Sequence, residues 1–248
     1  MEINTYLSQF NSISLQDMNS VSLMNRMDVK FLFKKSQLPI LLSKLISNYN
    51  LLKIENKIIQ DYKSLYFDTH NRSFYMAHHN RRVNRNKVRF REYVGSDLVF
   101  LEIKLKNNKG KTIKKRMRVD KIYKNLLPEH NVFIKNTINK DLRLIAQHWI
   151  NFKRITLVDK LKTERITIDL DLNYSNDSQS GSLDNIIIAE VKKDRSSQSS
   201  KFTYIAKKYH ITPTRMSKYC ISTINLNKDV KFNRFKSKLL LINKLQLL

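Results

Sequence analysis

The sequence predicts an α+β fold built on an antiparallel β-sheet of eight strands, with helices between and after them. Charged and apolar residues alternate through several segments, which is typical of strands with one apolar face. Turn-forming residues separate neighbouring segments closely, which favours hairpins over long crossover connections. Segments with helical spacing of Leu and Ile lie among the strands, and no linker or change in composition divides the chain.

The first third of the chain predicts two strands and a helix. Residues 1–24 are polar with scattered apolar positions and are expected to be an entry segment or a short helix. Residues 25–33 (NRMDVKFLF) alternate polar and apolar residues and predict the first strand. Leu and Ile recur at spacings of three and four through residues 36–49 after a Ser cap, which predicts an amphipathic helix. Tyr and Phe favour a strand over 61–69, and residues 71–82 form a connection with a helical turn.

A meander of three strands follows, because turn signals separate three alternating segments. These strands are 86–93, 97–106 and 111–120.

The remaining chain predicts three more strands. Residues 121–150 are expected to be mainly helical and to end in the apolar run LIAQHWI. A strand pair follows, and then one further strand, a helix and a basic amphipathic segment at the end of the chain. In order these are strands 153–159 and 163–172, loop 174–182, strand 185–194, helix 201–210 and segment 235–248.

Composition restricts the function. The chain carries 47 Lys and Arg against 21 Asp and Glu, a net charge of +26 that attracts polyanions. It has three Gly and neither GxGxxG nor GxxxxGK[ST], which excludes the dinucleotide fingerprint and the P-loop. The single Cys220 excludes an internal disulfide and a multi-cysteine metal site. Because no apolar run suits a signal peptide or a membrane span, we expect a soluble, cytoplasmic protein.

Charged residues occupy the same face of each predicted strand, and the opposite faces are chiefly Val, Ile, Leu, Phe and Met. An open sheet with one solvated face would show this pattern. Alternatively, eight strands close into a β-barrel around a wet tunnel, since burying many unpaired cations costs several kcal/mol each. Cations with a few carboxylates suit a chain of phosphates with a divalent metal. The charged positions are Asp28, Lys30, Arg89, Arg91, Glu102, Lys104, Lys106, Lys114, Arg116, Arg118, Arg154, Arg165, Asp169, Glu190 and Lys192.

An ordered set of segments resembles a known family. These are NRMDVKFLF, SLYFDT, NRNKVRFREY, FLEIKLKNNKGKTIKKRMRV, RITLV, ERITIDLDL, IIIAEVKKD and SKYC. They resemble the polyphosphate-polymerase (VTC) domain of the triphosphate tunnel metalloenzymes, in its bacterial stand-alone form. The resemblance implies an eight-stranded antiparallel β-barrel, the triphosphate tunnel, with flanking helices. The tunnel domain would span 25–236, after the N-terminal segment 1–24, with 237–248 as a C-terminal amphipathic helix of the same domain.

The resemblance also implies roles for individual residues. Catalytic positions that grip or orient phosphates are Arg89, Arg91, Lys104, Arg165 and Lys218. Further phosphate-binding positions are Lys30, Lys106, one of Lys115 and Arg116, Arg154, Lys192 and Ser217. Alternation favours Arg116 over Lys115, and Glu190 matches the family's ligand for Mn²⁺ or Mg²⁺.

Two positions depart from the wider pattern. The ExExK signature of the superfamily is replaced by Arg26, Asp28 and Lys30, which leaves fewer acids for a metal. Lys106 stands where fungal members carry a histidine, so chemistry assigned to that histidine is not implied. Glu102 and Asp169 are either further metal ligands or ion-pair partners of neighbouring arginines.

The implied activity is that of a metal-dependent phosphotransferase, transfer of the γ-phosphoryl group of ATP onto a growing polyphosphate chain. Two alternatives stay open: hydrolysis of triphosphate or small nucleotides by the same fold, and polyanion binding without catalysis. Nucleic acid is disfavoured as a partner because aromatic residues do not interleave with the basic ones. The expected partners are ATP, polyphosphate, inorganic phosphate and a membrane protein, which would place the chain at the inner face of a membrane. Segment 235–248 either lies on that membrane or packs against the barrel.

Overall fold

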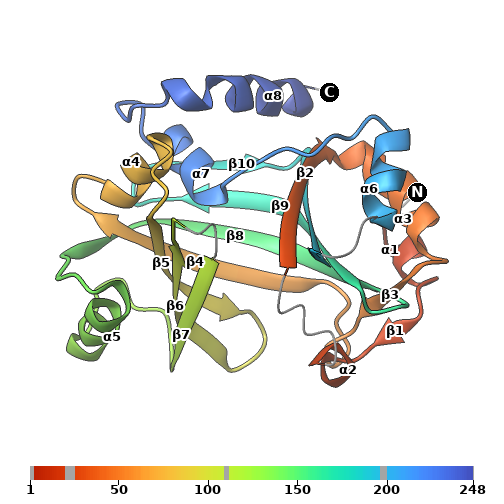
Figure 1. Cartoon of the computed structure of the whole chain (residues 1–248), viewed down its shortest axis with the longest axis horizontal. Helices are drawn as coiled ribbons and strands as arrows, with labels where there is room; N and C mark the ends of the chain where they lie inside the picture. The colour runs from red at the N-terminus through yellow and green to blue at the C-terminus, as the bar shows by residue number, and fades with distance from the viewer. Residues whose placement is uncertain (1–2, 20–25, 109–111, 196–199, 248) are drawn as a thin grey trace.

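One curved, antiparallel β-sheet organises the molecule (Figure 1). The computed structural model describes residues 3–19, 26–108, 112–195 and 200–247, apart from the side chains of Asn19 and Arg26. Eight strands form the main path of the sheet, and each pairs antiparallel with its neighbours. In spatial order they are β2 (Arg26–Lys34), β11 (Ile186–Asp194), β9 (Glu164–Ser175), β8 (Leu144–Asp159), β4 (Gln60–Thr69), β5 (Arg85–Tyr93), β6 (Leu98–Lys106) and β7 (Thr112–Val119).

These are the eight strands that the sequence predicts, and the α+β fold is confirmed. Three short strands extend the sheet, and two of them, β3 and β10, pair with β8 and β9. The third, β1, pairs in parallel with β3. Their bounds are β1 (Ser12–Ile13), β3 (Tyr49–Leu52) and β10 (Ser180–Leu183).

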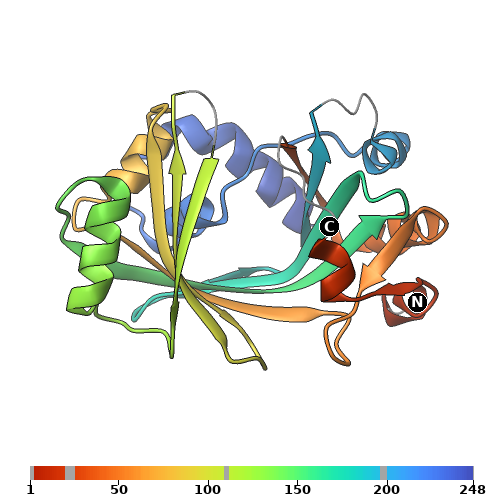
Figure 2. The ribbon, with the colours of Figure 1, turned by 60° about the horizontal axis from the view of Figure 1, so that its bottom comes forward.

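The sheet is open in the described part of the chain, with β2 and β7 as the ends of the path, so a closed barrel is not confirmed. Figure 2 shows its curvature: β5, β6 and β7 rise from the floor of the sheet at one side, and β11 rises at the other. The free edge of β2 is partly occupied. Pro213 bridges to Phe31, and the backbone N–H of Thr214 donates to the Lys30 carbonyl at 2.6 Å.

The prediction for residues 121–150 is wrong in its second half. Helix α5 (Pro128–Ile138) begins with Pro128, which a first helical turn tolerates, and ends at Asn139 with a φ of +57°. The apolar run LIAQHWI then opens β8, which continues to Asp159. Segment 174–182, predicted as a loop, contains the end of β9 and most of β10.

Helices cover both faces of the sheet, each over its own apolar cluster. On the convex face, α3 and α6 pack over Phe31, Ile155, Ile168 and Val191. On the opposite, concave face, α7 and α8 enclose a second cluster that includes Ile150 and Ile188. The remaining helices are α1 (Ile3–Leu7), α2 (Leu15–Asn19), η1 (Lys35–Gln37), α3 (Leu38–Leu45), α4 (Ser73–His79), α6 (Lys201–Lys208), α7 (Lys218–Leu226), η2 (Asn233–Phe235) and α8 (Lys236–Gln246).

The C-terminal helix α8 packs on the domain. Ile242 is buried, and Gln246 joins the helix end to Asn185 and Ser182 by hydrogen bonds of its side chain and its backbone carbonyl. Across the described ranges, no helix has the length and apolar character that a membrane span requires.

Candidate functional site

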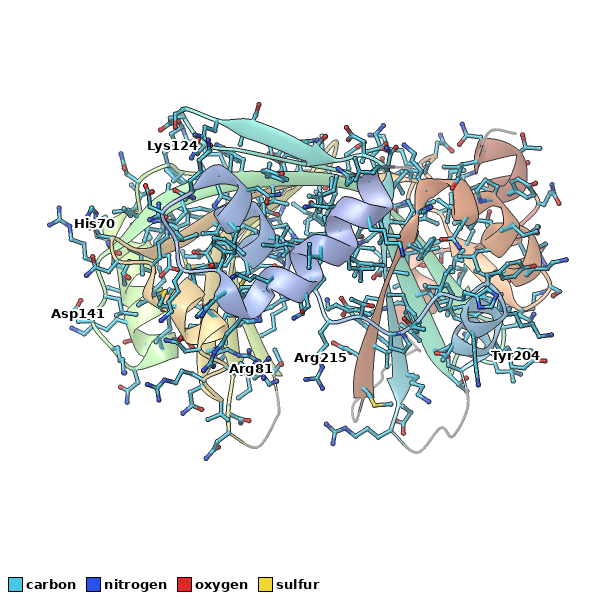
Figure 3. The ribbon with its side chains drawn as sticks, turned by 90° about the horizontal axis from the view of Figure 1, so that it is seen from above. His70, Arg81, Lys124, Asp141, Tyr204 and Arg215 are labelled. Atoms are coloured by element: carbon cyan, nitrogen blue, oxygen red, sulfur yellow. The ribbon has the colours of Figure 1, made fainter. Side chains whose placement is uncertain are left out.

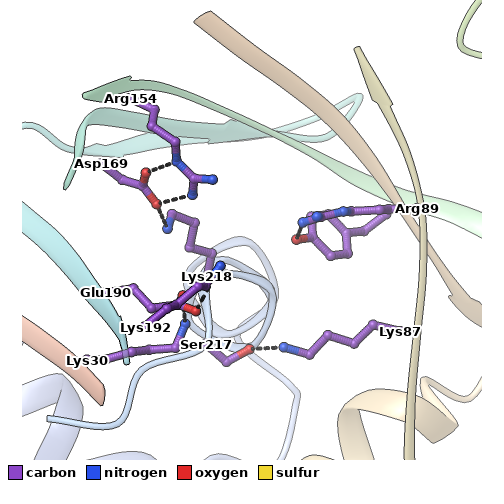
Figure 4. Close-up of polar contacts among 10 residues, drawn as sticks. Lys30, Lys87, Arg89, Arg154, Asp169, Glu190, Lys192, Ser217 and Lys218 are labelled. Carbon is purple, nitrogen blue, oxygen red and sulfur yellow. Dashed lines mark hydrogen bonds and ion pairs between the residues drawn. The ribbon is translucent and has the colours of Figure 1, made fainter. Parts of the chain in front are cut away.

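The charged side chains lie on the concave face of the sheet, beside α7. Residues directly opposite each other on paired strands share a face. Glu190 of β11 lies opposite Lys30 of β2, and Arg154 of β8 lies opposite Asp169 of β9. Arg89 of β5 lies opposite Glu102 of β6. The strands therefore bring residues from distant parts of the chain onto one surface. Figure 4 shows Arg89, Arg154 and Glu190 projecting toward a common space.

Glu190 stands between two lysines. Its Oε2 atom is 2.6 Å from Lys30 Nζ, and its Oε1 atom is 3.5 Å from Lys192 Nζ (Figure 4). Burial raises the pKa of this carboxyl group, but the charges of Lys30 and Lys192 outweigh burial and hold the pKa well below its usual value. Glu190 is therefore ionised at neutral pH.

Asp169 is shared in the same way by Arg154 and Lys218. Arg154 donates from Nε at 2.5 Å and from Nη2 at 2.8 Å, and Lys218 Nζ donates to the same carboxylate. Burial, followed by repulsion from Arg154 and Lys30, lowers the pKa of Lys218 to about 8 despite the attraction of Asp169. Lys218 therefore begins to lose its charge just above physiological pH.

Glu102 is fully buried and also lies between two cations. Arg89 donates to its Oε2 atom from Nε at 2.9 Å and from Nη2 at 2.6 Å, and Lys114 pairs with Oε1. Arg89 also donates to the Tyr66 hydroxyl at 2.6 Å. Glu102 and Asp169 are thus ion-pair partners of the arginines, one of the two roles that the sequence left open.

Arg91 and Lys104 are among the cations that lack a carboxylate partner within the described residues. Arg91, 7% exposed, donates only to the Ser64 hydroxyl at 3.3 Å, and burial followed by the Arg89 charge lowers its pKa to about 10. The charge of Arg89, then burial and the charge of Arg91, hold the pKa of Lys104 well below its usual value. Because like charges gather here, an anion bound between them would be stabilised.

Helix α7 presents Ser217 and Lys218 to this face. Ser217 caps the helix by accepting from the Cys220 N–H at 3.3 Å, and Lys87 donates to the same hydroxyl at 3.1 Å. The next residue, Tyr219, donates to buried Asp68 at 2.6 Å, and Asp68 also accepts from backbone N–H groups of α4. These bonds fix the helix that carries Lys218.

Aromatic side chains support the cations, and the sequence analysis missed them. Tyr62 and Phe152 stack with their ring centroids 5.1 Å apart. Arg91 and Arg154 lie over Tyr62 at 5.0 and 4.9 Å, and Lys218 lies over Phe152 at 4.8 Å. Tyr62 and Tyr66 are four residues apart in β4 and so share a face of the strand, with Tyr66 directly opposite Arg89. This spacing is the signal that would have placed both tyrosines on the charged face.

Most of the predicted site residues come together on the concave face. They are Lys30, Arg89, Arg91, Lys104, Arg154, Arg165, Glu190, Lys192, Ser217 and Lys218. Arg165 takes its place there as the cross-strand partner of Lys192. Lys87 and Lys114 belong to the same face but were not predicted as site residues, although each alternates with predicted positions.

Three predicted residues lie elsewhere or at the margin. Lys115 pairs with Ile103, whose side chain belongs to the core under α5, so Lys115 points away from the concave face. Arg116 lies on the concave side, 4.5 Å over the Phe100 ring, but it is exposed on the edge strand β7. Lys106 lies at the end of β6, opposite Arg85.

The residues fit a divalent metal only in part. Among the described residues, no group of three or more His, Cys, Asp or Glu side chains is placed to hold an ion. Mg²⁺ is commonly bound through one or two carboxylates together with substrate phosphates. Glu190 is paired with two cations, as Glu102 and Asp169 are, but its side chain is 18% exposed, against 0% for Glu102 and 4% for Asp169. Of the three carboxylates it is therefore the one that fits such a shared site.

Comparison with known proteins gives a family and a fold. The family model described as the VTC domain matches residues 25–227. No curated protein matches the chain. A similar solved structure is the putative adenylyl cyclase HpAC1 from Hippeastrum, described as having a dominant triphosphatase activity, with a TM-score of 0.50 and 13% identity. That comparison covers 82% of this chain and 97% of the Hippeastrum chain, and it supports the fold.

Two proteins from Pyrococcus horikoshii OT3 are more distant. PH1012 has a TM-score of 0.39 and 11% identity, covering 83% of this chain and 94% of its own. PH1819 has a TM-score of 0.38 and 11% identity, covering 74% of this chain and 87% of its own.

Proposed function

Because the chain belongs to the VTC domain family, we propose that it is a polyphosphate polymerase that transfers the γ-phosphoryl group of ATP onto a polyphosphate chain. The proposal places the reaction on the concave face, with the described sheet as the wall of a triphosphate tunnel. The observation that carries it is the excess of buried positive charge, since Arg91 and Lys104 have no carboxylate partner among the described residues. A row of phosphates supplies the missing negative charge.

In the proposed reaction, the terminal oxygen of the polyphosphate chain forms a bond to the γ-phosphorus of ATP. The bond from that phosphorus to the bridging oxygen breaks, and ADP leaves with the electron pair. Such a transfer needs in-line alignment and stabilisation of charge on the phosphate oxygens rather than a nucleophilic side chain. The cations on this face supply that stabilisation.

Individual residues divide the task. Arg91 and Lys104 bind phosphate oxygens, because neither has a carboxylate partner among the described residues. Lys218 shares Asp169 with Arg154 and would orient the incoming phosphate. Arg89 and Arg154 are held in place by Glu102 and Asp169, so their guanidinium planes are ordered before the substrate binds.

Lys30, Lys192 and Arg165 line the β2–β11–β9 side of the same face and would hold the phosphates of the chain. Glu190 would hold Mn²⁺ or Mg²⁺ jointly with phosphate oxygens, and the metal would neutralise charge on the transferred group. Glu190→Gln should abolish metal-dependent turnover, while the affinity for tripolyphosphate, measured without metal, is retained. Metal-dependent turnover equal to that of the unmodified protein would remove Glu190 as a ligand.

The test is incubation of the purified protein with ATP and Mn²⁺, with products resolved on a gel stained for polyphosphate and ADP measured in parallel. We expect a ladder of long chains with one ADP released per phosphate incorporated. The matched variants are Arg91→Gln, expected to lose the ladder, and Arg143→Gln on the exposed surface, expected to keep it.

Orthophosphate without chains would support hydrolysis instead, the activity named for the Hippeastrum protein. Tight tripolyphosphate binding without turnover would contradict catalysis and leave a polyanion-binding protein. A membrane partner that receives the product, at the inner face of a membrane, stays a prediction from the family resemblance.

A further inference from the structure

A second group of cations lies where the concave face reaches the surface beside α4 and α8. We call it the rim cluster: Arg81, Arg85, Lys106, Arg215 and Lys238. Arg81 follows α4, Arg85 begins β5 and Lys106 ends β6. Arg215 lies shortly before α7, and Lys238 lies in the first turn of α8. Figure 3 shows Arg81 and Arg215 near each other beside α8.

The contacts of neighbouring residues fix the position of the cluster. Arg85 of β5 and Lys106 of β6 are direct cross-strand partners. Lys238 Nζ lies 5.5 Å over the ring of Phe235, and that ring packs 6.0 Å from His78 at the end of α4. Helix α8 is therefore anchored on the helix that Arg81 follows.

The rim cluster continues a line of cations on one face of β5. Arg85, Lys87, Arg89 and Arg91 alternate along this strand, so they point to the same side. Lys87 reaches Ser217 on α7, and Arg215 lies two residues before Ser217. At 3.3–3.4 Å per residue, the six steps along the strand from Arg85 to Arg91 cover about 20 Å. Tripolyphosphate is too short to contact both ends of this line.

The charges of the rim cluster are not compensated within the described residues. None of its members forms an ion pair with a carboxylate there. Burial and the charges of Arg85 and Arg215 lower the pKa of Lys106. Burial and the charges of Arg81, Arg215 and Arg85 likewise lower the pKa of Lys238. Gathering these side chains costs free energy that a bound polyanion would offset.

Resting on the proposed function, we propose that the rim cluster is a secondary binding site for the polyphosphate chain. It holds phosphate units that have passed the reacting end and lie beyond Lys87. The protein consequently binds long chains more tightly than short ones, and a growing chain remains attached between successive transfers.

The test compares the affinity for tripolyphosphate with that for a polyphosphate much longer than the β5 line, by titration calorimetry at several salt concentrations. In the rim variant Arg81→Gln, Arg85→Gln, Arg215→Gln, we expect the preference for the long chain to fall about tenfold. The salt slope of long-chain binding should decrease by about 2, because three phosphate contacts are lost. The control variant Lys140→Gln, Arg143→Gln, Lys207→Gln removes the same charge from exposed positions elsewhere and should keep the preference.

Three results would overturn the inference. One is a rim variant that keeps the long-chain preference of the unmodified protein. Another is an equal loss in both variants, which would show an effect of net charge alone. The third is binding to phosphatidylglycerol vesicles that the rim variant loses while its long-chain affinity is kept, which would assign the cluster to a membrane surface. Absence of any tripolyphosphate binding by the unmodified protein would instead count against the proposed function.

Discussion

Each carboxylate on the floor of the concave face is shared by two cations. Glu102 holds Arg89 and Lys114, Asp169 holds Arg154 and Lys218, and Glu190 holds Lys30 and Lys192. An ion pair buried in this way contributes little net stability, because desolvation offsets the attraction. Each set of one carboxylate and two cations nevertheless keeps a net positive charge, and the ion pairs orient the cationic side chains before an anion binds. The carboxylates therefore position the cations without neutralising them.

Arg89 and Arg91 should respond differently to substitution because only Arg89 has a carboxylate partner. Arg89→Met leaves buried Glu102 with Lys114 alone and should lower the free energy of unfolding by about 3 kcal/mol. Arg91→Met relieves repulsion from Arg89 and should change that free energy by less than about 1 kcal/mol. Urea unfolding measures both, and tripolyphosphate affinity should fall in both. Equal destabilisation would contradict the assignment of Glu102 to Arg89.

Lys218 should give the protein a proton-linked affinity near pH 8. Its pKa of about 8 in the folded protein lies below the ordinary value of 10.5. Its unfavourable contribution to stability is therefore fully present below about pH 8 and is relieved as the pH rises from about 8 to 10.5. A bound phosphate raises this pKa, so binding takes up protons near pH 8 and weakens above it.

Calorimetry at pH 8 in two buffers with different ionisation enthalpies measures this proton uptake. Lys218→Arg, which stays charged, should reduce the uptake, whereas an unchanged uptake would assign it to another group such as Lys104.

At the scale of single elements, α7 connects the site to the rest of the fold. Ser217→Ala removes both the helix cap and the acceptor for Lys87, and should cost about 1 kcal/mol of stability and weaken tripolyphosphate binding. Ser200→Ala is a matched control, because Ser200 caps α6 by accepting from the Thr203 N–H on the convex side of the sheet. Thermal unfolding and calorimetry separate the two effects. An equal loss of affinity in both variants would show that helix stability alone is measured.

The strands that the sequence predicted best are those with one charged face and one apolar face. Strand segments without this difference were missed. Seven of the eight main strands follow from the alternation of charged with apolar residues, and β4 follows from its Tyr and Phe content. The first half of β8 shows no such alternation, because Ile150 is buried in the concave cluster and Trp149, on the opposite face, packs against the cluster under α5. Strands β1, β3 and β10 have at most four residues each, too few for a period to be seen.

For the site, alternation placed the arginines and lysines on one face, and the family resemblance selected among them. The pairing of cations with acids was not predictable in the same way. It depends on cross-strand register, such as Arg154 opposite Asp169, and on the position of α7, which lies far along the chain from both.

At the scale of the whole molecule, the curvature of the sheet brings the charged faces of its strands together around one concave surface. The arms of the sheet rise on the same side as α7, so Lys87 of β5 comes into contact with Ser217, 130 residues along the chain (Figures 2 and 4). A net charge of +26 adds self-repulsion to the compact state, and a bound polyanion reduces it. The concave face is where the buried part of this charge is concentrated.

The most direct test of this account is a crystal structure of the protein with tripolyphosphate. We expect the phosphates to lie on the concave face, with their oxygens within hydrogen-bond distance of Arg91, Lys104 and Lys218. An anion ordered only on the outer surface, with those three side chains free of contact to it, would contradict the account.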